Sequence, residues 1–69
     1  MRQDTQATRA RIVGAAERLF AERGVDAVSL NEISRAAGQR NKTATQYHFG
    51  DKRGLLRAIL DKHLSLIHI

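Results

Sequence analysis

Polar and basic side chains that can bond to nucleic-acid bases and phosphates gather between residues 38 and 53. This segment has four Lys or Arg residues against one Asp, so it carries +3 of the chain's net charge of +5. Asparagine and glutamine amides pair with adenine, whereas lysine and arginine pair with guanine or with phosphate. A helix over 41–48 would be polar nearly all round, which packing alone does not favour. The pattern indicates a surface for duplex nucleic acid, and ordinary solvated charges are the alternative.

Patterns for catalysis and metal binding are missing from the sequence. None of its histidines (His48, His63 and His68) forms an HxxxH pair with a carboxylate. Asp61 and His63 are two residues apart, so they do not face each other on a helix. There is no glycine-rich phosphate loop or nucleophile elbow, and without cysteine there is no thiolate zinc site. We expect no enzyme activity, no catalytic residue, no metal and no cofactor.

Length and composition suit one small domain. The 69 residues are 42% apolar, but ten of the apolar residues are alanine and three are aromatic, so the core must be small. A core of this size supplies only about 3–5 kcal/mol of stability. No apolar run is long enough to cross a membrane, and the first residues lack the apolar stretch of a signal peptide. These features predict a basic intracellular domain.

Helical patterns cover most of the chain and are separated by glycines that suit the ends of helices: Gly24, Gly38 and Gly50. We predict four helices, over about residues 5–23, 29–37, 41–48 and 51–64. Ser29 and Glu32 form a capping-box pattern, and Asp51 suits an N-cap. Gly14, inside the first helix, predicts close packing there. The expected fold class is all-α: a small bundle with a helix-turn-helix and the start of a fourth helix.

Three stretches of sequence resemble the tetracycline-repressor (TetR) family of bacterial regulators: TRARIVGAAERLFAERG (8–24), SLNEISRAAG (29–38) and YHFGDKRGLL (47–56). They are similar to the family's first helix, its second helix, and the exit from its recognition helix into the fourth. The resemblance covers residues 8–64. It implies a homeodomain-like DNA-binding domain over residues 1–64, acting as the sequence-specific head of a transcriptional repressor.

The segment 38–49 departs from the commonest pattern of that family. It is one residue longer, and it resembles a subgroup with Gln-Arg-Asn in the turn. Thr45 stands where many members have Leu or Val, and Gln46 stands where many have the first of two tyrosines. The fold expectation is unchanged, but the register of the base contacts stays open by one residue.

The resemblance and the docking geometry of the motif imply base contacts from the turn and the helix over 41–48. The candidates for base contacts are Arg40, Asn41, Lys42, Thr43 and Gln46. The alternative is that these are only exposed polar positions.

Phosphate contacts are expected from a second set of residues: Lys52, Tyr47, His48, Ser29, Thr8 and Arg9. Lys52 is the strongest candidate, because a cation in the first turn of a helix opposes the helix dipole unless it has an anionic partner such as phosphate. The alternative is a free surface lysine. The Tyr47 ring is expected to pack on the first helix while its hydroxyl meets a phosphate. The His48 ring is expected beside Phe49. Ser29 is expected to cap the second helix and, by the resemblance, also to contact a phosphate.

Partners also follow from the resemblance. It implies double-stranded DNA as half of a pseudo-palindromic operator, and no membrane. In a full-length parent it implies a homodimer and a small-molecule inducer, both through a C-terminal domain that we expect this chain to lack. The expected location is the cytoplasm of a bacterium, at the nucleoid.

The final residues, LSLIHI (64–69), resemble the in-frame translation of an adapter used to prepare sequencing libraries. We interpret residues 65–69 as a non-native tail on a truncated reading frame. The alternative is a genuine continuation of the fourth helix, with Leu64 and Ile67 on its apolar stripe. Synonymous codons in place of the adapter sequence would contradict the first interpretation.

A helical protein-interaction module is the alternative function. Its docking face would be the apolar side of the helix over 51–64, which includes Leu56, Ile59 and Leu60. This alternative predicts salt-insensitive binding to a protein, whereas DNA binding weakens steeply with salt.

Overall fold

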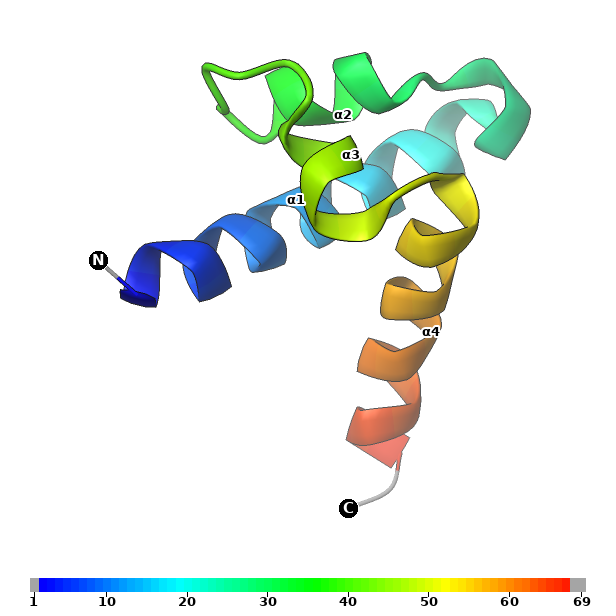
Figure 1. Ribbon diagram of the computed structural model, residues 1–69. Helices are drawn as coiled ribbons and strands as arrows, with labels where there is room; N and C mark the ends of the chain where they lie inside the picture. The colour runs from blue at the N-terminus through cyan, green and yellow to red at the C-terminus, as the bar shows by residue number, and fades with distance from the viewer. Residues whose placement is uncertain (1, 68–69) are drawn as a thin grey trace.

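The computed structural model describes the backbone of residues 2–67 and the side chains of residues 6–64. Four α-helices and one 3₁₀ turn make up this part of the chain: α1 (Arg2–Arg23), η1 (Val25–Ala27), α2 (Leu30–Ala36), α3 (Ala44–Phe49) and α4 (Lys52–Ile67). No strand occurs among these residues, and the all-α prediction is confirmed. Figure 1 shows α2 and α3 lying against α1, while α4 runs away from them at a steep angle.

The core lies where the four helices meet. Ile12 of α1, Ile33 of α2 and Leu55 of α4 are fully buried, and Val28, just before α2, is 1% exposed. Phe49 at the end of α3 is partly buried against this cluster. The core is small because four of its nine buried apolar residues are alanine, as the alanine-rich composition leads one to expect.

Helix ends follow the glycine and cap signals of the sequence. The three glycines after α1, α2 and α3 have φ of 87°, 78° and 84°, a region that other residues rarely adopt. Ser29 and Glu32 form both hydrogen bonds of the capping box. Asp51 caps α4, since its Oδ1 accepts the Gly54 N–H at 3.0 Å. All three predictions are confirmed.

Two glycines inside helices have opposite surroundings. Gly14 of α1 has open space around its Cα, so the close packing expected there is wrong. Gly54 of α4 has the close approach instead, because a Cβ built there would overlap the carbonyl oxygen of Phe49. Only glycine therefore allows the chain to turn from α3 into α4 as it does.

The third helix begins at Ala44, three residues later than expected. Asn41 is responsible, because its Oδ1 accepts the Thr43 N–H at 2.9 Å and the Thr43 hydroxyl at 2.7 Å. The Ala44 N–H donates to the Asn41 carbonyl at 3.0 Å, which closes the turn. Such side-chain bonds compete with the helical ones. Residues 41–43 therefore belong to the turn.

The backbone of α4 continues to Ile67, past the predicted end at residue 64. Residues 68 and 69 lie outside the described residues. The interpretation of residues 65–69 as a non-native tail stays a prediction.

Candidate nucleic-acid interface

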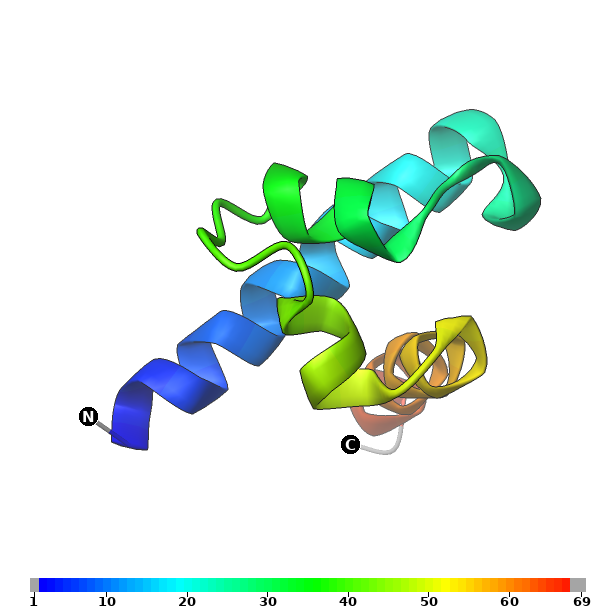
Figure 2. The ribbon, with the colours of Figure 1, turned by 45° about the horizontal axis from the view of Figure 1, so that its top comes forward.

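A shallow groove joins the turn between α2 and α3 to the N-terminal half of α1. Its lining residues are Ala7, Thr8, Arg11, Gly38, Gln39, Arg40 and Asn41. Figures 1 and 2 show the turn, in green, lying over this half of α1. The groove brings the expected Thr8, Arg40 and Asn41 together on one surface. It also includes Arg11, a cation that was not selected from the sequence.

The expected base-contacting residues are exposed, but most lie outside the helix. Arg40, Lys42 and Gln46 are exposed, and no hydrogen bond or ion pair engages their side chains within the described part of the chain. Asn41 and Thr43 are exposed too, and they bond to each other. The structure therefore corrects the placement of Asn41, Lys42 and Thr43, which precede α3 rather than form its first turn.

Tyr47 and His48 stand differently from each other at the end of α3. The Tyr47 side chain is 83% exposed, so the expected packing of its ring on α1 is wrong. Its ring lies edge-on to the His48 ring, with centroids 5.2 Å apart. The half-buried His48 ring lies 6.3 Å from that of Phe49, where it was expected. The phenol of Tyr47 therefore points into solvent.

Arg9 ties α1 to the end of α3. Its Nη1 donates to the His48 carbonyl at 3.3 Å, and its guanidinium carbon lies 4.5 Å from the centre of the Phe49 ring. Cation–π contacts of this kind stabilise modestly at exposed sites. Since a guanidinium has five N–H donors, Arg9 keeps donors for a phosphate.

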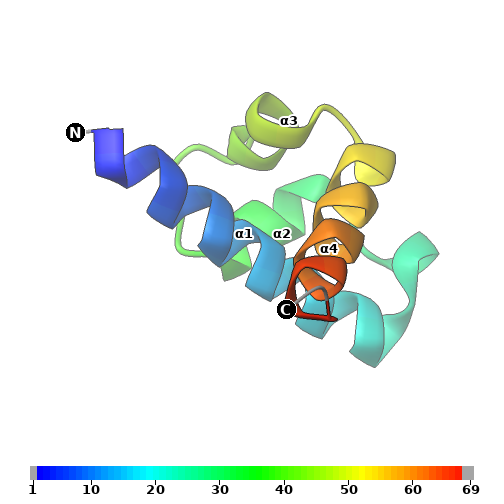
Figure 3. The ribbon, with the colours of Figure 1, turned by 90° about the horizontal axis from the view of Figure 1, so that it is seen from below.

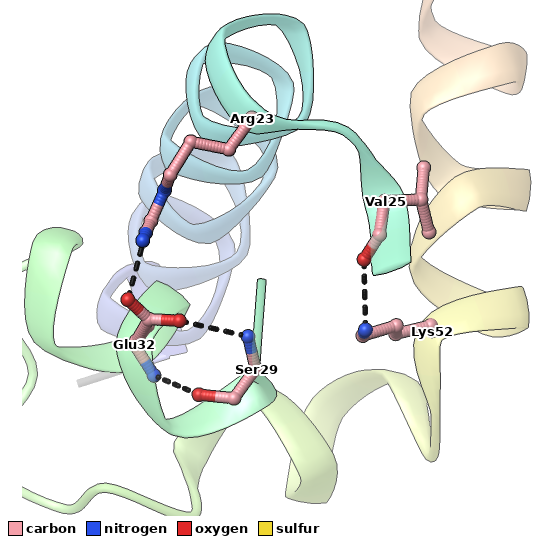
Figure 4. Close-up of polar contacts among 5 residues, drawn as sticks. All are labelled: Arg23, Val25, Ser29, Glu32 and Lys52. Carbon is pink, nitrogen blue, oxygen red and sulfur yellow. Dashed lines mark hydrogen bonds and ion pairs between the residues drawn. The ribbon is translucent and has the colours of Figure 1, made fainter. Parts of the chain in front are cut away.

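Lys52 and Ser29 lie at the far end of α2 from the turn, near η1 (Figure 4). Nζ of Lys52 donates to the Val25 carbonyl at 2.8 Å. Oγ of Ser29 accepts the Glu32 N–H at 3.1 Å, and Oε1 of Glu32 accepts the Ser29 N–H at 3.0 Å. Two contacts hold the pKa of Glu32 below its ordinary value. The hydrogen bond from the Ser29 N–H has the larger effect, and the ion pair with Arg23 at 2.7 Å has the next largest. A duplex that contacted both the turn and the Ser29 end of α2 would have to span the length of α2, about 10 Å.

Comparison with known proteins identifies the family of this chain. The family model described as "Bacterial regulatory proteins, tetR family" matches residues 12–59, which include α2, the turn and α3. This chain belongs to the TetR family. It is 42% identical over 60 residues to the HTH-type transcriptional regulator TtgR of Pseudomonas putida, covering 87% of this chain and 28% of TtgR. It is 43% identical over 58 residues to the HTH-type transcriptional regulator AcrR of Shigella flexneri, covering 84% of this chain and 26% of AcrR.

The chain spans about a quarter of the length of these curated TetR-family relatives. No solved structure matches it significantly. In this TetR-family domain, α2, the turn and α3 form a helix-turn-helix.

The TetR-type helix-turn-helix contains a buried polar pair that the sequence analysis missed. Ser34 of α2 and Thr45 of α3 are fully buried, with their hydroxyl oxygens 2.7 Å apart. One signal was present: Ser34 comes four residues after Leu30 and three before Ala37, on the same helical face. Thr45 lies four residues before Phe49 and was counted among the polar positions. The observed α3 is therefore less polar than was expected of a helix over 41–48.

The other side of this TetR domain carries ion pairs and an apolar strip. Glu17 of α1 accepts Lys62 Nζ at 2.7 Å and lies 2.6 Å from His63 Nε2 of α4. The bond from Lys62, followed by that from His63, holds the pKa of Glu17 below its ordinary value. Leu56, Leu60 and Leu64 are exposed along α4.

Groups that suit metal binding or membrane insertion were sought in the same residues. No cluster of three or more His, Cys, Asp or Glu occurs in the part of the chain that the structure describes. None of the described helices has the length and apolar character needed to span a membrane.

Proposed function

We propose that this TetR-family domain binds duplex DNA in a sequence-specific manner, with the turn and α3 in the major groove. One observation carries the proposal. The turn and α3 present Arg40, Lys42 and Gln46 to solvent, and the turn lies beside Arg11 on α1. Exposed amide and cationic groups beside a second cation match the edges of bases flanked by phosphates.

The base contacts proposed are those of Arg40, Asn41, Lys42, Thr43 and Gln46. Arg40 and Lys42 suit guanine, and the Gln46 amide suits adenine. Asn41 uses only its Oδ1 within the turn, so its NH₂ group keeps both donors for a base. The Thr43 hydroxyl, which donates to Asn41, keeps its lone pairs as acceptors.

The phosphate contacts proposed are those of Lys52, Tyr47, His48, Ser29, Thr8 and Arg9. The exposed Tyr47 hydroxyl is available without any rearrangement. The Lys52 ammonium has three donors and uses one on Val25, which leaves two for a phosphate. Arg11 joins the set because it lines the same groove as Thr8.

The longer protein implied by the relatives is proposed to be a bacterial, cytoplasmic repressor at the nucleoid. It would act as a homodimer on a pseudo-palindromic operator, with each copy of α3 in one half-site. A small-molecule inducer bound to its second domain would release the operator by changing the spacing of the two heads. We propose that the domain has no catalytic activity.

A second candidate function is protein docking on α4. The observation in its favour is the strip of Leu56, Leu60 and Leu64, which are 39%, 58% and 52% exposed. Such a strip suits an apolar partner, whose binding depends little on salt.

Fluorescence anisotropy with a labelled random duplex tests the proposed function. Titrations from about 50 to about 200 mM salt should show affinity falling linearly on logarithmic axes. A pool of random duplexes, enriched over rounds of binding, should then give one preferred sequence. A folded chain that binds no duplex even at low salt contradicts the proposal.

A further inference from the structure

Two buried hydroxyl groups join α2 to α3. The Ser34 and Thr45 hydroxyl oxygens are 2.7 Å apart, and Oγ of Ser34 also accepts the Thr45 backbone N–H at 3.1 Å. Both residues are 0% exposed. Polar groups buried this deeply are costly unless they are bonded. Here each hydroxyl has a partner, so the pair is a bonded unit inside the core.

Ser34 takes the role of a cap for α3. The first N–H groups of a helix have no partner within that helix. Thr43, at the N-cap position, makes no capping bond, and its hydroxyl donates to Asn41 instead. The Thr45 N–H is satisfied by Ser34, a residue of the neighbouring helix. This differs from α2, whose cap is its own Ser29.

Ser34 also holds the other end of the turn. Its backbone carbonyl accepts the Gln39 N–H at 3.0 Å. The segment from Gln39 to Thr45 is therefore hydrogen-bonded to Ser34 at both of its ends. Residues 40–43 lie between these two bonds.

Hydrogen bonds restrain this arrangement in a way that an apolar contact does not. Apolar burial has no preferred direction, whereas hydrogen bonds require a short distance and a good angle. One oxygen of Ser34 meets both the side chain and the backbone of Thr45. The two contacts restrain the separation of α2 and α3 and also the rotation of α3 about its own axis.

We propose that Ser34 is a positioning residue for DNA recognition, acting with Thr45 to fix how the turn and α3 present their side chains. The inference rests on the proposed DNA-binding function. It adds that a buried hydroxyl, which touches no DNA, sets sequence discrimination. General attraction to phosphates is set by the exposed cations and does not depend on Ser34.

The test compares variants on two duplexes, the sequence selected by the unmodified chain and a scrambled version of it. Ser34→Ala should lower the ratio of the two affinities about tenfold and leave the scrambled duplex within about twofold, since phosphate contacts carry no sequence information. Thr45→Ser keeps both bonds and should keep the ratio. Ile33→Val, a fully buried change on the same helix, controls for lost stability and should also keep it.

A folded Ser34→Ala that discriminates as well as the unmodified chain overturns the inference, as does an equal loss of discrimination in Ile33→Val. If Ser34→Ala does not fold, Thr45→Val takes its place. That change removes the hydroxyl bond and keeps the backbone bond to Ser34. It should reduce discrimination less than tenfold but measurably, and an unchanged ratio overturns the inference.

Amide hydrogen exchange in the unmodified chain gives a readout that needs no DNA. The Thr45 N–H should be protected as strongly as the buried Ile33 N–H, because Ser34 holds it. Exchange as fast as that of an open first-turn amide overturns the inference. If the unmodified chain binds no duplex, the proposed function fails by itself. If it discriminates and Ser34→Ala does so equally, only the positioning role fails.

Discussion

On the side of the turn and α3, Arg40 and Lys42 extend into solvent, and within residues 6–64 no carboxylate or carbonyl engages them. At the junction of α1 and α4, by contrast, Lys62 is engaged by Glu17. Figure 3 shows this junction from below, with α4 crossing α1. One region uses its cations to hold two helices together, and the other leaves them for a partner. Both regions contain lysine side chains, so residue type alone does not tell them apart.

Lys52 and Arg9 are intermediate between the unengaged cations of the turn and the ion-paired Lys62. Each donates one hydrogen bond to a carbonyl and keeps further donors. The comparison therefore predicts three kinds of behaviour on mutation: loss of binding alone, loss of stability alone, and loss of both.

The largest effect on stability is expected at Gly54, where the chain turns from α3 into α4. Gly54→Ala places a Cβ on the Phe49 carbonyl, so α3 and α4 must shift. We expect the free energy of unfolding to fall by about 3 kcal/mol, near the upper end of the effects seen when a core is overpacked. That is comparable with the whole stability expected of such a small domain, about 3–5 kcal/mol. Urea unfolding followed by circular dichroism measures it.

Gly14→Ala is the matched control for that change. It makes the same substitution inside α1, where nothing contacts the new methyl group. It should raise the free energy of unfolding by about 1 kcal/mol, through helix propensity. Equal effects of the two variants would contradict the close approach at Gly54.

The next effect separates the two classes of cation. Arg40→Ala should weaken binding to the selected duplex by about tenfold or more, as loss of a bidentate base contact does, with little change in stability. Lys62→Ala removes the same charge from the junction and should leave DNA affinity within about twofold. Anisotropy titrations at one salt concentration compare them. If Lys62→Ala weakens binding as much as Arg40→Ala, overall charge is the cause and the comparison fails.

Lys52→Ala should show the intermediate behaviour. The slope of log affinity against log salt should become shallower by about 1, because one phosphate contact is lost. The thermal midpoint should also fall, because the bond to Val25 is lost. A lower midpoint with an unchanged salt slope would make Lys52 purely structural.

The smallest effect concerns acid stability at the α1–α4 junction. The Glu17 pKa is lowered in the folded chain from its ordinary value of 4.5, so its contribution to stability is complete above that value and is lost as the pH falls through the lower folded value. Glu17→Gln should therefore lower the thermal midpoint near pH 6 and have less effect near pH 3. Glu22→Gln, an exposed site on the same helix, should show no such difference. A pH-independent effect of Glu17→Gln would contradict the ion-pair account.

Features that depend on neighbours in sequence could be predicted. The capping box of Ser29 and Glu32 and the glycines after α1, α2 and α3 are local signals, and the structure contains them all. The late start of α3 was also encoded locally, by Asn41. It was missed because asparagine suits both a helix cap and a competing turn.

Features that depend on which helices meet could not be predicted from spacing. The bond of Lys52 to Val25 and the pairing of Ser34 with Thr45 join residues 27 and 11 positions apart. The exposure of Tyr47 was misjudged for the same reason, since an aromatic ring suits both a core and a contact surface. The base-contact register stays open because the length of a turn does not fix how it is oriented.

The central claim is that the turn, α3 and the N-terminal half of α1 form the DNA-binding surface. The most direct test is a titration of isotope-labelled chain with the selected duplex, followed by amide chemical shifts. The account predicts that the largest changes fall in residues 39–47 and 8–11, with residues 56–64 nearly unmoved. Changes concentrated on the Leu56, Leu60 and Leu64 strip, with the turn unmoved, would contradict it.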